Sequence, residues 1–179
     1  HFSVKRINDK NHATTVFYGD NTIVAGNNDI GMGGTNNWDA YGTGTTESVT
    51  GGKLRVVTTT AEAVQGVELP LANSGTPVVG RTYRIRAKLK RISGLDPATI
   101  HIYYGGVSAA VKATDGSPSN GEITDSEEQY EVTLTATDAT GKLYIVNLAN
   151  TTALTFEIDA VYLKEVGIAS GWTDADQQL

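Results

Sequence analysis

Apolar and polar residues alternate along much of the chain, and this period of two is typical of antiparallel strands with one buried and one solvated face. The alternation is clearest in TYRIRAKLKRI at 82–92. One face of that segment carries Tyr83, Ile85, Ala87 and Leu89, and the other carries Arg84, Arg86, Lys88 and Lys90. The segment YEVTLTATD at 130–138 repeats the pattern, with Val132 and Leu134 on the apolar face and Glu131 on the polar face. Both segments are predicted to be antiparallel strands.

Five further segments are rich in strand-forming residues and are separated by residues that form turns. The predicted strands are KLRVVTTT (53–60), GVELPL (66–71), TIHIYYGG (99–106), KLYIVNLA (142–149) and TFEIDAVYLKEV (155–166). The predicted turns are Gly51-Gly52, Asn73-Ser74-Gly75, Gly105-Gly106, Asp115-Gly116-Ser117-Pro118 and Thr140-Gly141. No window of about 11 residues shows the period of a helix. Many short strands with regular turns predict an all-β sandwich or barrel.

The last predicted strand, TFEIDAVYLKEV, changes phase in its middle. Its apolar residues are Phe156 and Ile158 in the first half. In the second half they are Val161 and Leu163, which have the opposite parity. A shift of one residue without a turn is what a β-bulge produces. We therefore expect one long strand with a bulge near Asp159, and we expect this strand to close the sandwich.

Charge limits the partners of the chain. The net charge is −6 and the isoelectric point is about 5.0, which argues against a nucleic acid partner because phosphates need a basic face. One basic run exists, on the polar face of the segment at 82–92. We interpret it either as a solvated strand face or as the cross-strand partner of Glu131, since opposite charges on paired strands attract each other.

The length of 179 residues fits one large β domain or one domain with short attachments. Charged residues make up 19% of the chain, and the absence of cysteine excludes disulfides and thiolate metal sites. No apolar run of about 18 residues is present, so no membrane span is expected, and no signal peptide is visible. Because the first residue is His1 rather than Met, we expect the chain to be processed or to be a segment of a larger protein.

Four motifs occur in a fixed order between residues 21 and 166. They are GNNDIGMGGTNNWDAYGTG, VTGGKLRVVTT, VGRTYRIRAKLK and FEIDAVYLKEV. In this order they resemble the carbohydrate-binding modules of families 4 and 9. The resemblance implies an antiparallel jelly-roll β-sandwich over 21–166.

The segments on either side of 21–166 are expected to lie outside that sandwich. Residues 1–20 contain two short strand-like runs, at 1–7 and 14–18, and are expected to form a short N-terminal strand or hairpin extension or the end of a preceding domain. Residues 167–179 look like the linker into a following domain in phage structural proteins. Modules of the resembled kind occur in polysaccharide-degrading enzymes and in phage tail and virion proteins.

The resemblance, together with the linker-like tail, implies a non-catalytic structural or adhesive domain of a bacteriophage virion, such as a tail fibre, a spike or a capsid decoration. Such a domain is extracellular, assembles with other virion proteins or with copies of itself, and binds polysaccharide on the host surface. The alternative is a carbohydrate-binding module of a secreted polysaccharide-degrading enzyme. A spacer without a ligand is a third reading.

Aromatic residues are the candidates for sugar binding, because the C–H face of a pyranose stacks on a flat ring beside amide and carboxylate groups. Trp38 and Tyr41 in NNWDAYG form one candidate platform. Tyr103 and Tyr104 form another, because adjacent residues of a strand point to opposite faces and one must lie outward or in a groove. The alternatives are that Trp38 plugs the edge of the core, and that the tyrosine pair is one core and one surface residue without a ligand.

The resemblance also implies a structural calcium ion, with Asp29 near the start of the sandwich and Asp159 in the closing strand among its ligands. Calcium prefers about six to eight oxygen ligands, which carboxylates, amides and backbone carbonyls supply. The sequence departs from the family's pattern at Ile30, where a Phe is usual. The alternative is that Asp29 caps a turn and that Asp159 bonds the backbone at the bulge.

No catalytic motif is visible in the sequence. The three histidines, His1, His12 and His101, do not have the spacing of metal ligands. A glycosidase needs two carboxylates across a cleft, and none of the acidic residues lies in a recognisable motif of that kind. The glycine-rich GMGG is not followed by a predicted helix, so it is not expected to bind phosphate. We therefore expect that the chain is not an enzyme.

Overall fold

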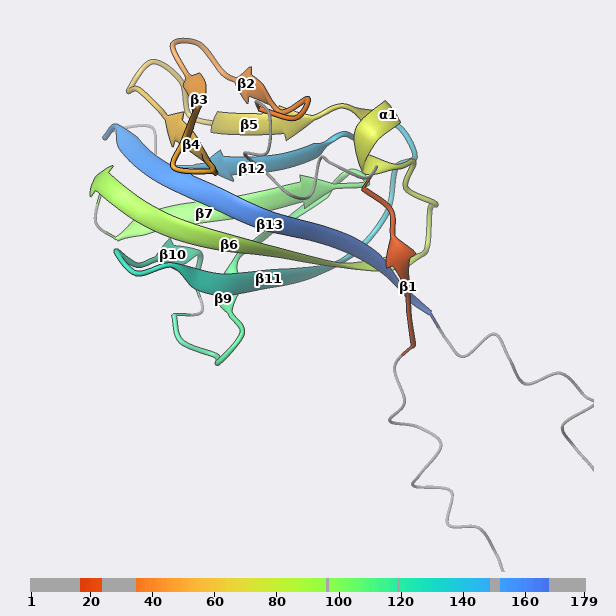
Figure 1. Ribbon diagram of the computed structural model, residues 1–179. Coiled ribbons are helices and arrows are strands. Elements are labelled where there is room, and N and C mark those ends of the chain that lie inside the picture. The colour runs from red at the N-terminus through yellow and green to blue at the C-terminus, as the bar shows by residue number, and fades with distance from the viewer. Residues whose placement is uncertain (1–16, 24–34, 96, 119, 149–151, 168–179) are drawn as a thin grey trace, which may run out of the picture.

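The computed structural model describes residues 17–23, 35–95, 97–118, 120–148 and 152–167. More than half of this part of the chain forms β-strands, and the one helix within it is the single turn α1 (Leu71–Ser74). The strands form two antiparallel sheets that pack face to face (Figure 1). The prediction of an all-β sandwich is therefore confirmed.

Sheet I has seven strands in the order β3-β4-β13-β6-β11-β9, with β1 beside β13. Its strands are β1 (Phe17–Asn21), β3 (Thr46–Thr50), β4 (Lys53–Val57), β6 (Thr82–Gly94), β9 (Lys112–Ala113), β11 (Glu128–Thr135) and β13 (Leu154–Gly167). Sheet II has six strands in the order β10-β7-β12-β5-β2, with β8 beside β7. Its strands are β2 (Asp39–Tyr41), β5 (Gln65–Leu69), β7 (Ala98–Tyr104), β8 (Val107–Ala110), β10 (Glu122–Ile123) and β12 (Leu143–Asn147).

The chain crosses repeatedly from one sheet to the other. Strands β4, β6, β11 and β13 belong to sheet I, whereas β5, β7 and β12, which come between them in the sequence, belong to sheet II. Apart from the hairpins β3–β4 and β7–β8, most neighbours within a sheet are therefore distant in the chain, and β13 lies between β4 and β6 (Figure 1). This connectivity is that of a jelly roll, as predicted.

The hydrophobic core lies between the sheets and contains the inward residues of both. Ile85, Ala87 and Leu89 of β6 have 0% exposure, as their alternation predicts. Ile100 and Ile102 of β7 enter the core from sheet II and are also fully buried. Because the apolar residues of both sheets face each other, the remaining polar and aromatic residues are left on two separate outer faces.

The predicted bulge is present in β13. Asp159 pairs with Lys88 and Tyr162 pairs with Arg86. Between these two pairs, β13 contains one residue more than β6. Ala160 has a φ of 48°, which is the left-handed region. The Asp159 carboxylate Oδ1 accepts a hydrogen bond of 2.8 Å from the Ala160 backbone N–H. Asp159 therefore bonds the backbone at the bulge, which was one of the two interpretations of this residue.

The bulge keeps the apolar residues of β13 inward along its whole length. Those before it and those after it are fully buried, and they are Phe156, Ile158, Val161 and Leu163. Tyr162 lies between two of them in the sequence but is 40% exposed, so it is on the outer face of sheet I. Without the extra residue, the strand would turn its second apolar pair to solvent.

Strand β1 crosses the domain boundary that the sequence predicts near residue 20. It pairs with the end of β13, where Phe17 lies opposite Gly167. Sheet I therefore extends beyond the predicted sandwich at both ends. Residues 1–16 and 168–179 lie outside the described part of the chain, so their roles as extension and linker stay predictions.

The strands that the sequence analysis missed are short and lie at sheet edges. They are β2, β3, β8, β9 and β10. An edge strand has a partner on one side and fewer residues to bury, so its alternation is weak. One predicted turn also differs, because Asn73 and Ser74 belong to α1.

Two of the predicted glycine turns join strands that pair directly. Gly51-Gly52 joins β3 to β4, and Gly105-Gly106 joins β7 to β8. In each turn the two glycines have φ values of 60° and 79°. A two-residue hairpin with positive φ at both positions requires residues that tolerate the left-handed region, and glycine does so without steric cost.

The outer face of sheet I carries the basic run of β6, and a carboxylate faces it. Arg84 Nε donates to Glu131 Oε2 at 2.9 Å, and Arg86 Nε donates to the same oxygen at 3.1 Å. The prediction of a cross-strand partner for Glu131 is confirmed. Burial alone would raise the pKa of the Glu131 carboxyl, but the hydrogen bonds from Arg84 and Arg86 outweigh it and hold that pKa below its ordinary value.

Substitution of Ala160 tests the strain at the bulge. Ala160→Gly removes the Cβ from a left-handed backbone but adds chain entropy, so the free energy of unfolding is expected to change by less than about 1 kcal/mol. Ala160→Val places a β-branched side chain in the same conformation and is expected to lower it by about 1–2 kcal/mol. Urea unfolding measures both, and an equal loss in the two variants would contradict the positive φ.

The lowered pKa of Glu131 predicts a pH-dependent contribution to stability. Its folded-state pKa lies below the unfolded value of about 4.3, so ionised Glu131 stabilises the fold above that pH. The stabilisation is lost as the pH falls through the folded-state pKa. Glu131→Gln is expected to lower the free energy of unfolding at neutral pH by about 1 kcal/mol and to flatten its decline in acid.

Chemical denaturation between about pH 3 and pH 7 measures this effect. Glu47→Gln is a matched control, because Glu47 forms no ion pair within the described part of the chain. An acid decline in Glu131→Gln as steep as in the parent protein would show that the arginines do not hold the carboxylate.

Candidate functional site

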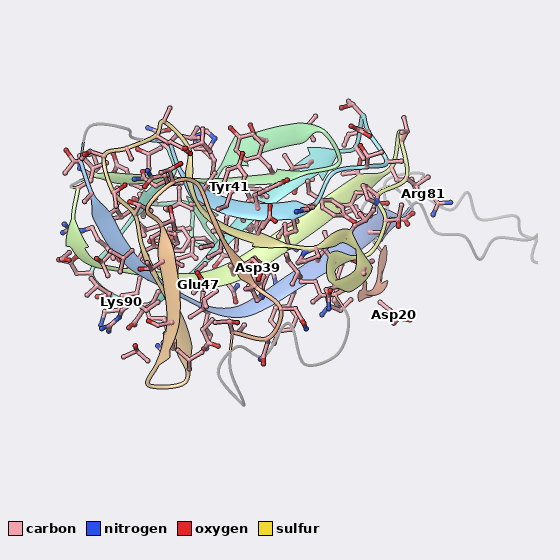
Figure 2. All side chains as sticks on the ribbon, turned by 90° about the horizontal axis from the view of Figure 1, so that it is seen from above. Asp20, Asp39, Tyr41, Glu47, Arg81 and Lys90 are labelled. Atoms are coloured by element: carbon pink, nitrogen blue, oxygen red, sulfur yellow. The ribbon has the colours of Figure 1, made fainter. Side chains whose placement is uncertain are left out.

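Three tyrosines from three strands meet on the outer face of sheet II. They are Tyr41 of β2, Tyr103 of β7 and Tyr144 of β12, and we call them the tyrosine face. Tyr144 is in the middle, with its ring centroid 4.9 Å from that of Tyr41 and 6.5 Å from that of Tyr103. Both contacts are edge-to-face, with interplanar angles of 65° and 83°. Tyr41 and Asp39 lie side by side on β2 (Figure 2).

Strand register brings these residues together. Tyr144 lies directly opposite Tyr103 in the pairing of β12 with β7. Tyr41 lies opposite Gly66 of β5, and Gly66 lies opposite Val146 of β12. Successive residues of a strand point to opposite faces. Tyr103 and Tyr144 therefore point outward, because the residues before and after each of them are buried.

A hollow of about 240 Å³ lies over this face. It is lined by Tyr41, Val64, Tyr103, Tyr144 and Val146. Its volume is below the range of about 300–1,000 Å³ that is usual for small-molecule pockets, and because it lies on the outer face of a sheet it is an open groove.

Gly66 lies on β5 between Tyr41 and Val146 and contributes no side chain to this face. A Cβ at this position would lie 2.2 Å from the Ile145 carbonyl oxygen and 2.7 Å from the Val146 Cα. No L-residue with a side chain fits there unless β12 moves. The close approach of β5 and β12 therefore depends on this glycine. Because Gly66 has no side chain, nothing projects from β5 at this point between Tyr41 and Val146.

Charged groups lie along one side of the tyrosine face. Glu68 is directly opposite both Tyr144 and Asp39 in the strand register. Its carboxylate forms an ion pair with the Lys142 ammonium. The hydrogen bond from this ammonium to Glu68 raises the pKa of Lys142. Burial, and then the negative charge of Glu68, raise the pKa of the Tyr144 phenol, so this hydroxyl is protonated at neutral pH and can donate a hydrogen bond.

His101 lies on the other side of the tyrosine face. It is opposite Val146 in the pairing with β12 and opposite Ala110 in the pairing with β8. Burial lowers the pKa of its imidazole, so the ring is neutral at neutral pH. Its Nδ1 has no hydrogen-bond partner among the described residues, and a neutral imidazole offers one donor and one acceptor.

Two of the four predicted aromatic residues lie on this face and two do not. Tyr41 is 37% exposed and Tyr103 is half-buried beside Tyr144. Trp38 is completely buried, so it plugs the core as the alternative interpretation held. Tyr104 is 1% exposed, and its hydroxyl donates to the Gly75 carbonyl at 2.9 Å. No ring face of Trp38 or Tyr104 is open to a ligand, which corrects the expectation that these two residues bind sugar.

Sequence reasoning missed Tyr144, which is the centre of the tyrosine face. The signal was present, because the segment LYIVN of β12 places Leu143 and Ile145 inward and leaves Tyr144 outward. An outward aromatic residue on a strand is a candidate contact, but its neighbours cannot be read from its own segment. Only the pairing with β7 brings Tyr103 beside it.

The predicted calcium site stays a prediction. Asp29 lies outside the described residues, and one oxygen of Asp159 is already bonded to the backbone of the bulge. Among the described residues, no three side chains of His, Asp or Glu are placed to hold a metal ion. In the same part of the chain, no helix is long and apolar enough to cross a membrane.

Comparison with known proteins finds similarity in structure. No protein-family model matches the sequence, and no curated protein matches it. The CBM22-1 xylan-binding domain of Xyn10C from Paenibacillus barcinonensis has a TM-score of 0.56 and 19% identity, over 78% of this chain and 92% of that one. The CBM22-1–GH10 modules of xylanase 10B from Clostridium thermocellum, solved with xylohexaose, have a TM-score of 0.52 and 11% identity, over 90% of this chain and 31% of that one.

At these identities the similarity shows the fold alone. The chain shares its β-sandwich with carbohydrate-binding modules of polysaccharide-degrading enzymes. The resemblance to families 4 and 9 in particular, and the setting of a phage virion, stay predictions.

Gly66→Ala tests the architecture of the tyrosine face. The added Cβ collides with the backbone of β12, so the free energy of unfolding is expected to fall by about 1–3 kcal/mol. Thermal unfolding measures the loss, and the near-ultraviolet circular dichroism of the tyrosines is expected to change because Tyr144 moves. Gly51→Asn is the control, since nothing lies within 4 Å of a Cβ at Gly51 and Asn tolerates its positive φ. Equal stability of Gly66→Ala and the parent protein would contradict the close strand approach.

Proposed function

We propose that this chain is a non-catalytic carbohydrate-binding domain that holds a polysaccharide against the tyrosine face of sheet II. The observation that carries the proposal is the meeting of Tyr41, Tyr103 and Tyr144 over one outward hollow. Each ring offers an apolar face for the C–H groups of a pyranose and a hydroxyl for its O–H groups. The fold shared with xylan-binding modules supports the same reading.

The angles between the rings favour a single soluble polysaccharide chain as the ligand over the flat surface of a crystalline polysaccharide. A flat surface needs rings in one plane, whereas Tyr41 and Tyr103 are inclined to Tyr144 by 65° and 83°. Inclined rings contact a chain from more than one side and match a chain that twists along its axis. We therefore expect soluble oligosaccharides to bind, and we expect the protein to stay in the supernatant when it is mixed with crystalline cellulose.

The charged groups beside the tyrosine face favour a neutral glycan. Asp39 and Glu68 carry two negative charges, and Lys142 carries one positive charge that Glu68 already pairs with. A polyanionic chain would be repelled by this excess of negative charge. Neutral hydroxyls, in contrast, are suitable partners for the Asp39 carboxylate and the Tyr144 hydroxyl.

The setting that we propose is a module that keeps a polysaccharide-degrading enzyme on its substrate. The two similar structures come from a xylan-binding domain and a xylanase, and this favours an enzyme module over a virion domain. An extracellular location and the polysaccharide partner belong to this proposal. Self-association, which was expected for a fibre, has no support from the described residues.

Titration calorimetry with xylohexaose and cellohexaose tests the proposal. Tyr41→Ala, Tyr103→Ala and Tyr144→Ala are each expected to weaken binding by about 3-fold to 10-fold, because one aromatic contact contributes about 0.5–1.5 kcal/mol. The largest loss is expected for Tyr144→Ala, since this ring contacts both others.

Tyr162→Ala is the matched control, because Tyr162 is an exposed tyrosine on the opposite outer face. It is expected to leave binding of these neutral hexaoses unchanged. No binding of either hexaose, or the same loss in Tyr162→Ala as in Tyr144→Ala, would overturn the proposed site. Thermal unfolding of every variant separates a lost contact from a lost fold.

A further inference from the structure

A second hollow, of about 260 Å³, lies on the outer face of sheet I, on the opposite side of the sandwich from the tyrosine face. It is lined by Arg84, Arg86, Gln129, Tyr162 and Lys164. We propose that this hollow binds an acidic sugar, with the sugar ring against Tyr162 and its carboxylate between the cationic side chains. This inference does not rest on the proposed function of sheet II.

The bulge in β13 places Tyr162 at this position. The extra residue at Ala160 reverses the phase of the strand, so that Tyr162 faces outward between two buried neighbours. Tyr162 lies opposite Arg86, and Lys164 lies opposite Arg84. Bulges often re-aim side chains at functional sites, and a non-glycine residue with positive φ at the same point is a strain that such sites retain.

The hollow is positive in a protein that is negative overall. Arg84, Arg86 and Lys164 contribute three positive charges and Glu131 contributes one negative charge, which leaves two, whereas the whole chain has a net charge of −6. Glu131 accepts hydrogen bonds from both arginines and so holds them in place. Lys164 forms no ion pair within the described part of the chain, so its ammonium is available to a ligand.

The chemistry of the lining matches a uronic acid. Tyr162 is 40% exposed, which leaves ring surface for the C–H face of a pyranose. Arginine and lysine are the side chains that bind carboxylates, arginine through paired N–H donors and lysine as a point charge. Gln129 also lines the hollow, and its amide oxygen is an acceptor for a hydroxyl group.

The positive region is too short for a nucleic acid. Farther along the same face, Lys88 lies opposite Asp159 and Lys90 lies opposite Glu157, so cations and carboxylates alternate. A polynucleotide needs a continuous basic surface for its regularly spaced phosphates. One carboxylated sugar, or a short run of them, fits a patch of this length better.

The test is a calorimetric titration of the whole chain with trigalacturonic acid and with its neutral methyl ester. The acid is expected to bind and the ester to bind at least about 10-fold more weakly. Raising the salt from roughly 20 mM to 300 mM is expected to weaken the binding of trigalacturonic acid, because salt screens exposed charges. Tyr162→Ala and Lys164→Gln are each expected to weaken the binding of trigalacturonic acid by about 3-fold to 10-fold.

Lys90→Gln is the matched control for charge. It removes one positive charge from the outer face of β6, four residues and about 13 Å from Arg86, and the comparison is made at roughly 150 mM salt, where the Debye length of about 8 Å is shorter than this separation. Arg81, which directly precedes β6, and Lys90, in the second half of β6, lie toward opposite ends of the molecule (Figure 2). Lys90→Gln is expected to bind trigalacturonic acid as the parent protein does.

Three results would overturn the proposal. The first is unchanged binding in Tyr162→Ala, and the second is equal weakening by Lys90→Gln and Lys164→Gln. The third is displacement of the acid by inorganic phosphate or by a single-stranded oligonucleotide at the same concentration, which would mark a general anion surface. Tyr144→Ala distinguishes the two sites, because it is expected to weaken the binding of xylohexaose and to leave the binding of trigalacturonic acid unchanged.

Discussion

The pairing of β13 with β6, with one extra residue in β13, is the constraint on which sheet I depends. β13 lies between β4 and β6, so its register sets both neighbours. The extra residue at Ala160 lets Phe156 and Val161, which have opposite parity, face the same core. The extra residue leaves Ala160 in the left-handed region, which is unfavourable for alanine. The Asp159 carboxylate accepts a hydrogen bond from the Ala160 N–H and stabilises this conformation.

The sandwich separates two outer faces of different chemistry. The face of sheet II presents Tyr41, Tyr103 and Tyr144 beside an excess of negative charge, which suits a neutral glycan. The face of sheet I presents Tyr162 among cations, which suits an acidic one. The two proposed sites share no residue, so the two proposals together predict that one domain contacts two components of a mixed polysaccharide at once.

Much of the fold follows from alternation, which is a local property. The segment at 82–92 predicted β6 and its buried face, and the change of phase near Asp159 predicted the bulge. The short edge strands escaped because they bury few residues. Aromatic chemistry singled out Tyr41 and the pair Tyr103–Tyr104, of which the structure places Tyr41 and Tyr103 outward, but it also chose Trp38, whose large apolar ring is equally suited to a core.

By itself, the sequence determined the all-β class, the inward and outward residues of the long strands, and the bulge, because each depends on neighbours within a few residues. The tertiary structure alone decided which outward residues meet. Tyr41, Tyr103 and Tyr144 are far apart in the chain, and Tyr162 reaches Arg86 only through the register of β13 on β6. Such meetings depend on strand order and register, which the jelly-roll crossovers fix over long chain distances and which no single segment encodes.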